Sequence, residues 1–178
     1  MIVAIDAGNS RIKWGLHDGH AWVARGVLAT ADVAWLKEAA EDWPADALVV
    51  VCNVAGGAVG RAIDALLAGL RRTAVHFHAG SECCDVRNGY AAPSQLGADR
   101  WAALVGARGL CRQDCIVVCA GTATTIDTLD AQGNFLGGLI LPGLDLMHRA
   151  LARDTAGLPF ANGHYSLLPR CTDDAIVS

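Results

Sequence analysis

The sequence predicts an α/β protein built from two related lobes, of which the second is incomplete. Apolar runs with the period of strands alternate with segments of helical period. A strand that ends in a glycine turn and is followed by another strand occurs twice, at residues 6–10 and at residues 119–123. The second occurrence leaves fewer residues for its lobe. We therefore expect one lobe over residues 1–110 and a partial lobe over residues 111–178.

The first lobe begins with three predicted strands. Met1–Ile5 is an apolar run, and Arg11–His17 alternates polar and apolar residues, which is the pattern of a half-buried strand. Asp18-Gly19 is a turn dipeptide that favours a third strand over Ala21–Leu28. Thr30 is suited to cap a helix that extends to Trp43.

The rest of the first lobe alternates strands and helices. Ala47–Cys52 is a continuous apolar strand of the buried kind. A helix is predicted over Arg61–Leu70, a short strand over Thr73–Phe77, and a polar connection over Gly80–Gln95. A helix over Leu96–Leu110 completes the lobe.

The second lobe is predicted to hold three strands, over Cys115–Cys119, Thr124–Leu129 and Phe135–Leu141. Pro142 is placed to begin a helix over residues 144–152. Residues 175–178 have the pattern of a helix start. We therefore expect either a chain cut short at residue 178 or a strongly shortened second lobe.

Composition excludes several classes of protein. Of the 178 residues, 53% are hydrophobic and 18% are charged, which argues against disorder, and a net charge of −4 argues against a nucleic-acid partner. The apolar runs are too short to span a membrane, and the N-terminus has no basic region typical of a signal peptide. Seven cysteines without a C-x-x-C pair indicate reduced, buried thiols, and the five tryptophans are expected in the core. The predicted location is the cytoplasm.

The turn after the first strand is a candidate phosphate site. Gly8 lets the backbone approach a phosphate closely, so that successive main-chain N–H groups form an anion-binding concavity. Asn9 and Ser10 add side-chain hydrogen bonds, and Asp6 could hold Mg²⁺ through water. Lys13 either joins this site or is simply solvated. An ordinary β-turn is the alternative interpretation of the segment.

The second glycine turn has the same character. Small and hydroxyl residues fill Cys119–Asp127, and the segment Gly137–Gly143 follows. A Thr-rich strand is the alternative, because β-propensity alone favours it. Two opposed lobes that each offer a phosphate-binding hairpin are the arrangement of the ribonuclease H-like superfamily of acetate and sugar kinases, Hsp70 and actin.

A third segment makes the resemblance specific. It contains N-x-Y-x-x-P-x-x-L-G-A-D-R over Asn88–Arg100, between D-x-G-N-S at the start and G-T-A-T-T-I-D with G-G-x-I-x-P-G later. In order and spacing these motifs resemble the type III pantothenate kinases, over essentially the whole chain. The same family includes proteins named Bvg accessory factor.

The resemblance implies a role for each matching residue. The ATP-phosphate segment corresponds to Asp6, Ala7, Gly8, Asn9, Ser10, Arg11, Ile12 and Lys13, and Thr122 corresponds to a second nucleotide contact. The pantothenate-binding positions correspond to Tyr90, Gly97, Ala98, Asp99, Arg100 and Thr172, with Asp99 as the catalytic base. The implied reaction is the ATP-dependent phosphorylation of pantothenate to 4′-phosphopantothenate, the first step of coenzyme A biosynthesis. The family implies Mg²⁺, often K⁺ or NH₄⁺, and a cytoplasmic homodimer.

Simpler interpretations exist for three of these residues. Asp99 could be a first-turn acid that stabilises the helix dipole, Arg100 an exposed, solvated side chain, and Tyr90 an aromatic anchor of its loop. Cys119 stands where most of the family has Asp at the cation position, and a thiol is a poor ligand for K⁺. The cation requirement is therefore in doubt for this chain.

Two other functions remain open at the level of sequence. One is a nucleotide-binding accessory or regulatory protein without kinase activity, which would act through protein partners because the net charge is negative. The other is a related kinase for a different small hydroxy acid.

Overall fold

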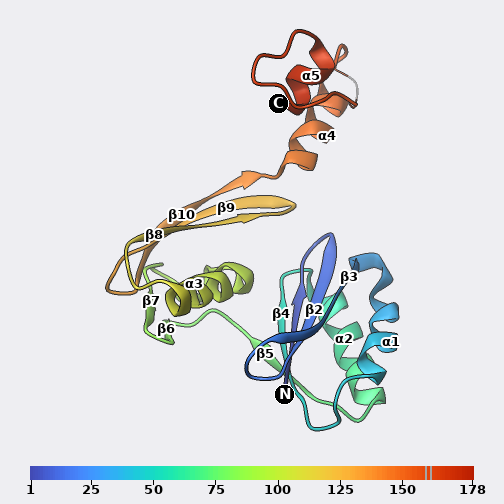
Figure 1. Cartoon of the computed structure of the whole chain (residues 1–178), viewed down its shortest axis with the longest axis vertical. Helices are drawn as coiled ribbons and strands as arrows, with labels where there is room; N and C mark the ends of the chain where they lie inside the picture. The colour runs from blue at the N-terminus through green and yellow to red at the C-terminus, as the bar shows by residue number, and fades with distance from the viewer. Residues whose placement is uncertain (159, 161) are drawn as a thin grey trace. The chain divides into compact units, whose positions relative to one another are not determined.

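The computed structural model describes residues 1–158, 160 and 162–178. The chain forms two compact units (Figure 1): unit 1 comprises residues 1–117 and 127–137, and unit 2 comprises residues 118–126 and 138–178. Two five-stranded sheets and their helices confirm the α/β prediction. The predicted division into two related lobes, over residues 1–110 and 111–178, stays a prediction. The two units are defined by their internal contacts, and these contacts do not show whether two lobes are related.

The first sheet has the strand order β3-β2-β1-β4-β5. Its strands are β1 (Ile2–Ala7), β2 (Arg11–His17), β3 (Trp22–Ala29), β4 (Leu48–Asn53) and β5 (Ala74–Phe77). Strand β2 is antiparallel to both β1 and β3, whereas β4 pairs with β1, and β5 with β4, in parallel. All five predicted strands of this region are confirmed within two residues at either end.

Helices cover one face of this sheet (Figure 1). They are the 3₁₀ helix η1 (Thr30–Trp35), α1 (Leu36–Glu41) and α2 (Gly57–Gly69). Alternate residues of β1 point to this side, and Val3, Ile5 and Ala7 are at most 2% exposed there. Ala4 and Asp6 therefore belong to the opposite face, because successive side chains of a strand alternate.

The predicted helix over residues 30–43 is wrong in detail. The segment begins as 3₁₀ helix, departs from helical geometry at Asp32, and ends as a short α-helix at Glu41. Thr30 does not cap this helix. Its hydroxyl donates instead to the Gly8 carbonyl, at 2.6 Å, and so ties the end of β3 to the turn between β1 and β2. The following helix, α2, begins at Gly57, four residues before the predicted start.

The second sheet has the strand order β6-β7-β10-β9-β8. Its strands are β6 (Glu82–Cys83), β7 (Val86–Asn88), β8 (Cys115–Ala120), β9 (Ala123–Leu129) and β10 (Asn134–Pro142). The three long strands confirm the prediction. The polar connection over 80–95 is a partly wrong prediction, because it contains β6, β7 and the 3₁₀ helix η2 (Pro93–Gln95). Its hairpin turns at Cys84 and Asp85, which both have positive φ without being glycine.

Helix α3 (Ala98–Leu110) packs on a second core. Its Trp101 and Leu104 are buried with Val86, Leu129 and Phe135. The helix starts two residues after the predicted start, with Gly97 as its N-cap.

Unit 2 carries two helices, α4 (Leu144–Asp154) and α5 (Thr172–Val177). Pro142 does not begin α4 as predicted. It is the last residue of β10, because Gly143 follows in extended conformation and donates its N–H to the Thr122 carbonyl at 2.9 Å.

Two expectations about burial need correction. Trp43 and Trp101 lie in the cores, but Trp22 and Trp35 are 51% and 63% exposed. Among the cysteines only Cys52 is buried, and the exposed ones are Cys84, Cys119 and Cys171. Over the described residues, none of the helices combines the length and hydropathy needed to cross a bilayer.

Thr30→Val should lower the free energy of unfolding by about 1 kcal/mol, because it removes the hydrogen bond to the Gly8 carbonyl. Thr30→Ser keeps the hydroxyl and should lose less. Chemical denaturation of the three proteins measures the difference. Equal stability of wild type and the Val variant would contradict a stabilising role for this bond.

Candidate active site

Three side chains lie in one row across neighbouring strands. Asp6 on β1 is in register with Lys13 on β2 and with Cys52 on β4. The Asp6 carboxylate lies 3.2 Å from the Lys13 ammonium group, and both side chains are exposed. The row therefore presents a carboxylate and an ammonium group at the surface, above a buried thiol.

The turn beside this row is held from two sides. The Gly8 N–H donates to the Arg11 carbonyl at 3.0 Å, and Thr30 N–H donates to the Ser10 carbonyl at 3.1 Å. A Cβ at Gly8 would lie 3.2 Å from the Arg11 oxygen, so a side chain fits poorly at this position. Of the predicted ATP-binding residues, Ala7 and Ile12 are fully buried. These two could contact a nucleotide only through their backbone.

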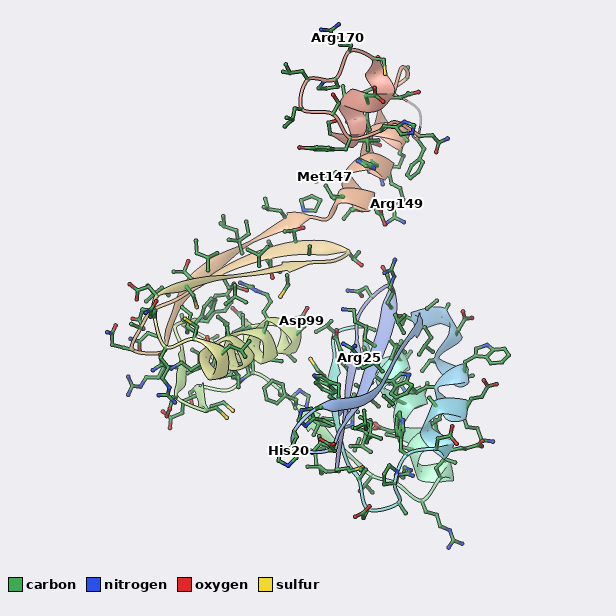
Figure 2. All side chains as sticks on the ribbon, viewed as in Figure 1. His20, Arg25, Asp99, Met147, Arg149 and Arg170 are labelled. Carbon is green, nitrogen blue, oxygen red and sulfur yellow. The ribbon has the colours of Figure 1, made fainter. Side chains whose placement is uncertain are left out.

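Asp99 lies in the first turn of α3 (Figure 2). Its side chain bends back so that Oδ1 accepts the Arg100 N–H at 2.8 Å. The same oxygen lies 2.6 Å from the place where a Cβ on Gly97 would be. Gly97 therefore leaves room for the carboxylate, and Oδ2 receives no hydrogen bond from the described residues.

Asp6 and Asp99 both act on Cys52. Burial, and after it the negative charges of Asp6 and Asp99, raises the pKa of the Cys52 thiol to about 12. The two carboxylates are thus close enough to influence one group, although 93 positions of sequence separate them. Strand β4, which carries Cys52, contacts both β1, which carries Asp6, and α3, which carries Asp99.

Arg100 is not the exposed side chain of the simpler interpretation. Its side chain is 5% exposed, and its guanidinium group forms a forked pair with the Asp127 carboxylate through Nε, at 3.1 Å, and Nη2. Nη1 donates to the Tyr90 hydroxyl at 3.0 Å, and the guanidinium carbon lies 5.7 Å from the centre of the Tyr90 ring. The hydrogen bonds to Asp127 raise the pKa of Arg100 above its usual value.

The loop that carries Tyr90 is held by Asn88. The amide Nδ2 of Asn88 donates to the Gly80 and Pro93 carbonyls, and its Oδ1 accepts the Tyr90 N–H at 3.0 Å. A Cβ at Gly89 would lie 2.0 Å from the Phe135 carbonyl oxygen, so only glycine fits there. Asn88 and Gly89 therefore serve to place Tyr90.

The second glycine turn lies in unit 2. Thr122 is exposed between β8 and β9, and its carbonyl accepts the Gly143 N–H. A Cβ at Gly143 would lie 2.0 Å from the Gly121 carbonyl oxygen. The G-T-A motif and the P-G motif therefore pack against each other and are joined by the hydrogen bond from Gly143 to Thr122. Cys119 is exposed on β8.

Thr172, the last predicted site residue, is also in unit 2. It is exposed and begins α5, with Cys171 as the N-cap. Asp174 of the same helix accepts the His164 N–H at 2.9 Å, and this hydrogen bond lowers the pKa of Asp174. Unit 1 therefore holds Asp6, Tyr90, Asp99 and Arg100, and unit 2 holds the two threonines.

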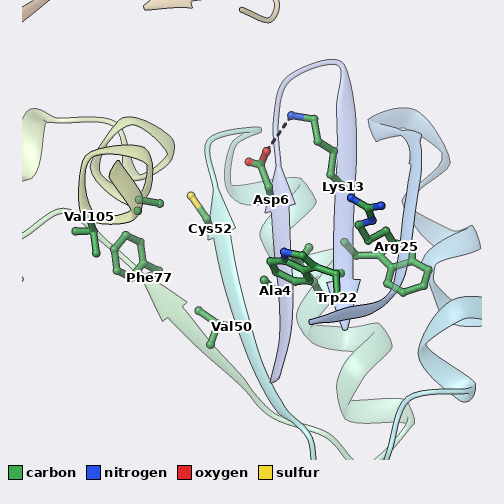
Figure 3. Close-up of a pocket in the computed structure, with 14 residues that line it drawn as sticks. Ala4, Asp6, Lys13, Trp22, Arg25, Val50, Cys52, Phe77 and Val105 are labelled. Carbon is green, nitrogen blue, oxygen red and sulfur yellow. Dashed lines mark hydrogen bonds and ion pairs between the residues drawn. The ribbon is translucent and has the colours of Figure 1, made fainter. Parts of the chain in front are cut away.

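A pocket of about 510 Å³ adjoins Asp6 and Lys13 in unit 1 (Figure 3). The open face of the first sheet forms one wall, and α3 forms another through Ala102, Val105 and Gly106. Apart from Asp6, Lys13 and Arg25, its lining side chains are apolar or thiol. Such a lining suits the apolar part of a ligand and does not suit a triphosphate. Any phosphate site would therefore lie at the edge of this pocket, beside Asp6 and Lys13.

Comparisons with known proteins point to one family. The family model described as type III pantothenate kinase matches residues 2–178. The chain is 56% identical over 178 residues to the type III pantothenate kinase of Aromatoleum aromaticum, and the match covers all of this chain and 74% of that protein.

The chain belongs to the type III pantothenate kinase family.

Solved structures show the fold of this family member more widely. A Campylobacter jejuni protein described as a Baf family transcriptional activator matches with a TM-score of 0.61 at 22% identity, over 99% of this chain and 72% of that one. A Sinorhizobium meliloti protein described as a 2-dehydro-3-deoxygalactonokinase matches with a TM-score of 0.56 at 18% identity, over 88% of this chain and 58% of that one. These matches show that the chain shares the α/β fold of both proteins, in agreement with the fold class predicted from sequence.

Sequence reasoning missed three residues around the site. Thr30 is predicted as a helix cap and Cys52 as part of a strand, and Asp127 appears only as the last residue of the G-T-A-T-T-I-D motif, with no role of its own. Asp127 carried the one usable signal, because a carboxylate within an apolar and Thr-rich strand requires a buried partner. The pairing of Cys52 with Asp6 follows from strand register, which a single sequence does not specify.

The raised pKa of Cys52 predicts its reactivity. At pH 8 only about one thiol in ten thousand would be ionised, so iodoacetamide should label Cys52 far more slowly than the exposed Cys84. Asp6→Asn and Asp99→Asn should each speed the labelling of Cys52 severalfold, because each removes a negative charge that acts on it. Mass spectrometry of the labelled peptides measures the rates.

Asp64→Asn is the matched control. Asp64 lies on α2, where its Oδ1 lies 2.8 Å from Nε2 of the His76 ring, and it has no part in the Cys52 shift. If Asp64→Asn changed the labelling rate of Cys52 as much as Asp99→Asn does, the result would contradict the proximity of Asp99 to the thiol.

Proposed function

We propose that this chain transfers the γ-phosphoryl group of ATP to the primary hydroxyl of pantothenate, which forms 4′-phosphopantothenate, the first intermediate of coenzyme A biosynthesis. Membership of the type III pantothenate kinase family supports the reaction. The observation in the structure that carries the proposal is one pocket shared by two motifs: Asp6 and its strand partner Cys52 line it, and so does α3, the helix whose first turn holds Asp99. A phosphoryl transfer needs such a convergence of a phosphate site and a base.

Asp99 is the proposed catalytic base. Its Oδ1 is held by the Arg100 N–H, which leaves Oδ2 to accept the proton of the pantothenate hydroxyl. The hydroxyl oxygen then forms a bond to the γ-phosphorus as the bond from that phosphorus to the ADP oxygen breaks. Because the transition state is loose, catalysis depends mainly on positioning and on neutralisation of charge.

The turn over residues 6–13 is the proposed site of the ATP phosphates, with Lys13 and Arg11 as exposed cations and Thr122 as a second nucleotide contact. Among the described residues, no three His, Cys, Asp or Glu side chains gather to hold a metal. The exposed Asp6 carboxylate is a hard oxygen ligand, and Mg²⁺ in such sites takes its other ligands from phosphate and water. Asp6 therefore fits a water-mediated Mg²⁺ contact, through which the ion would neutralise phosphate charge.

Tyr90, the segment Gly97–Arg100 and Thr172 are the proposed pantothenate contacts. We further propose that the protein works in the cytoplasm as a homodimer, with no nucleic-acid partner. The description of one solved relative as a transcriptional activator keeps a regulatory role in view. Rescue of a strain that lacks pantothenate kinase distinguishes the two roles, because a non-catalytic accessory protein would not restore growth.

Asp99→Asn should lower kcat by about 10²- to 10⁴-fold, with the KM for ATP little changed, because the amide cannot accept the hydroxyl proton. A coupled assay of ADP formation that depends on pantothenate measures both constants. Asp145→Asn is the matched control, since Asp145 is also a first-turn acid but lies on α4. Full turnover by the Asp99 variant would refute the base, and equal losses in both variants would indicate a helix-dipole role. A panel of small hydroxy acids tests the substrate.

Cys119 predicts weak dependence on monovalent cations. Because the thiol offers no hard oxygen, exchanging K⁺ for Na⁺ at constant ionic strength should change the rate by less than about twofold. Cys119→Asp should create a preference for K⁺ or NH₄⁺, whereas Cys84→Asp, at another exposed thiol, should not. A strong K⁺ requirement in the wild type would show that other groups hold the cation.

A further inference from the structure

Asp127 is a buried carboxylate with a single cationic partner. It lies on β9, and its side chain is 1% exposed, so it is out of reach of a substrate. Both of its oxygens accept N–H groups of Arg100. A fork of this kind fixes the plane of the guanidinium group as well as its position.

Arg100 in turn contacts Tyr90 through a hydrogen bond to its hydroxyl and through its ring. The guanidinium group donates three hydrogen bonds, two to the Asp127 carboxylate and one to the Tyr90 hydroxyl. Its carbon also lies 5.7 Å from the centre of the Tyr90 ring and 5.8 Å from the centre of the Phe135 ring, and these two rings pack against each other. Asn88 holds the Tyr90 backbone, Phe135 packs against its ring, and Arg100 donates a hydrogen bond to its hydroxyl.

The same fork holds the start of α3. Arg100 follows Asp99 directly, and the Arg100 N–H is the donor to the Asp99 carboxylate. A guanidinium group anchored on β9 therefore restrains the turn of α3 that carries the acid. Through Arg100, the buried Asp127 carboxylate is therefore linked to both Tyr90 and Asp99.

We propose that Asp127 is a positioning residue for pantothenate: it orients Arg100, and through Arg100 it sets the Tyr90 hydroxyl and the Asp99 turn. The inference rests on the proposed function for its substrate. It goes beyond that function because it assigns a role to a residue outside the contacts of the substrate.

Asp127→Asn tests the orientation with little change in size. The amide presents a donor where the carboxylate presents an acceptor, so one of the two Arg100 N–H groups loses its partner and the guanidinium group must turn. The KM for pantothenate should rise by about ten- to a hundredfold, since a displacement of 1 Å can have an effect of this size, and the KM for ATP should stay within about twofold.

Asp130→Asn is the matched control. It is the same substitution three residues further on, where Asp130 accepts hydrogen bonds from the backbone of Gln132 and Asn134 and from the Asn134 side chain. It should lower stability without a selective change in the KM for pantothenate. Equal changes in both variants, or a change in both KM values of the Asp127 variant, would overturn the proposal in favour of a purely structural pair.

Tyr90→Phe serves if the Asp127 variant does not fold. It removes only the hydroxyl at the end of the chain of contacts, and it should raise the KM for pantothenate; an unchanged KM would overturn the proposal. In the double variant with Asp127→Asn the two effects should be less than additive.

The NMR signal of Arg100 Nε–H tests the fork without any substrate. It should exchange slowly with solvent in the wild type and rapidly in the Asp127→Asn variant; equal exchange would overturn the inference. A wild type that fails to phosphorylate pantothenate while its Arg100 signal responds as expected would refute the proposed function and not the orientation by Asp127.

Discussion

The pair of Arg100 and Asp127 is the interaction on which the candidate site in unit 1 depends. Both side chains are almost completely buried, and each is the main partner of the other. An ion pair in this setting contributes little net stability, since desolvation offsets most of the attraction, but the loss of one partner leaves a charge that the interior cannot solvate. The pair is therefore best understood as a constraint on geometry, which joins β9, the start of α3 and the loop after β7.

Glycine provides a second constraint at each turn of the site. Gly89, Gly97 and Gly143 stand where a Cβ would meet a carbonyl or carboxylate oxygen at 2.6 Å or less. Two of them let backbones approach each other, and Gly97 leaves space for the Asp99 carboxylate. The glycines of the sequence motifs thus have steric reasons that need no ligand.

The two faces of the first sheet have different roles: one packs in the hydrophobic core, and the other lines the pocket beside the candidate site. Strand alternation sends Val3, Ile5 and Ala7 into the core under α1 and α2. Asp6 is on the other face, where it lines a pocket together with residues of α3. A substitution on one face of β1 should therefore affect packing, whereas one on the other should affect binding.

Patterns in the sequence determined the first sheet, the three long strands of the second sheet and the positions of α2 and α3, because strands and amphipathic helices repeat their apolar residues at fixed intervals. They failed at the hairpin through Cys84 and Asp85, where two residues other than glycine adopt positive φ. The motifs pointed to Asp6, Tyr90, Asp99 and Arg100 as site residues. Only the tertiary structure paired Arg100 with Asp127, tied Thr30 to Gly8 and set Cys52 beside Asp6. Those contacts join residues far apart in the chain, and their partners are chosen by strand register and packing, which local patterns do not encode.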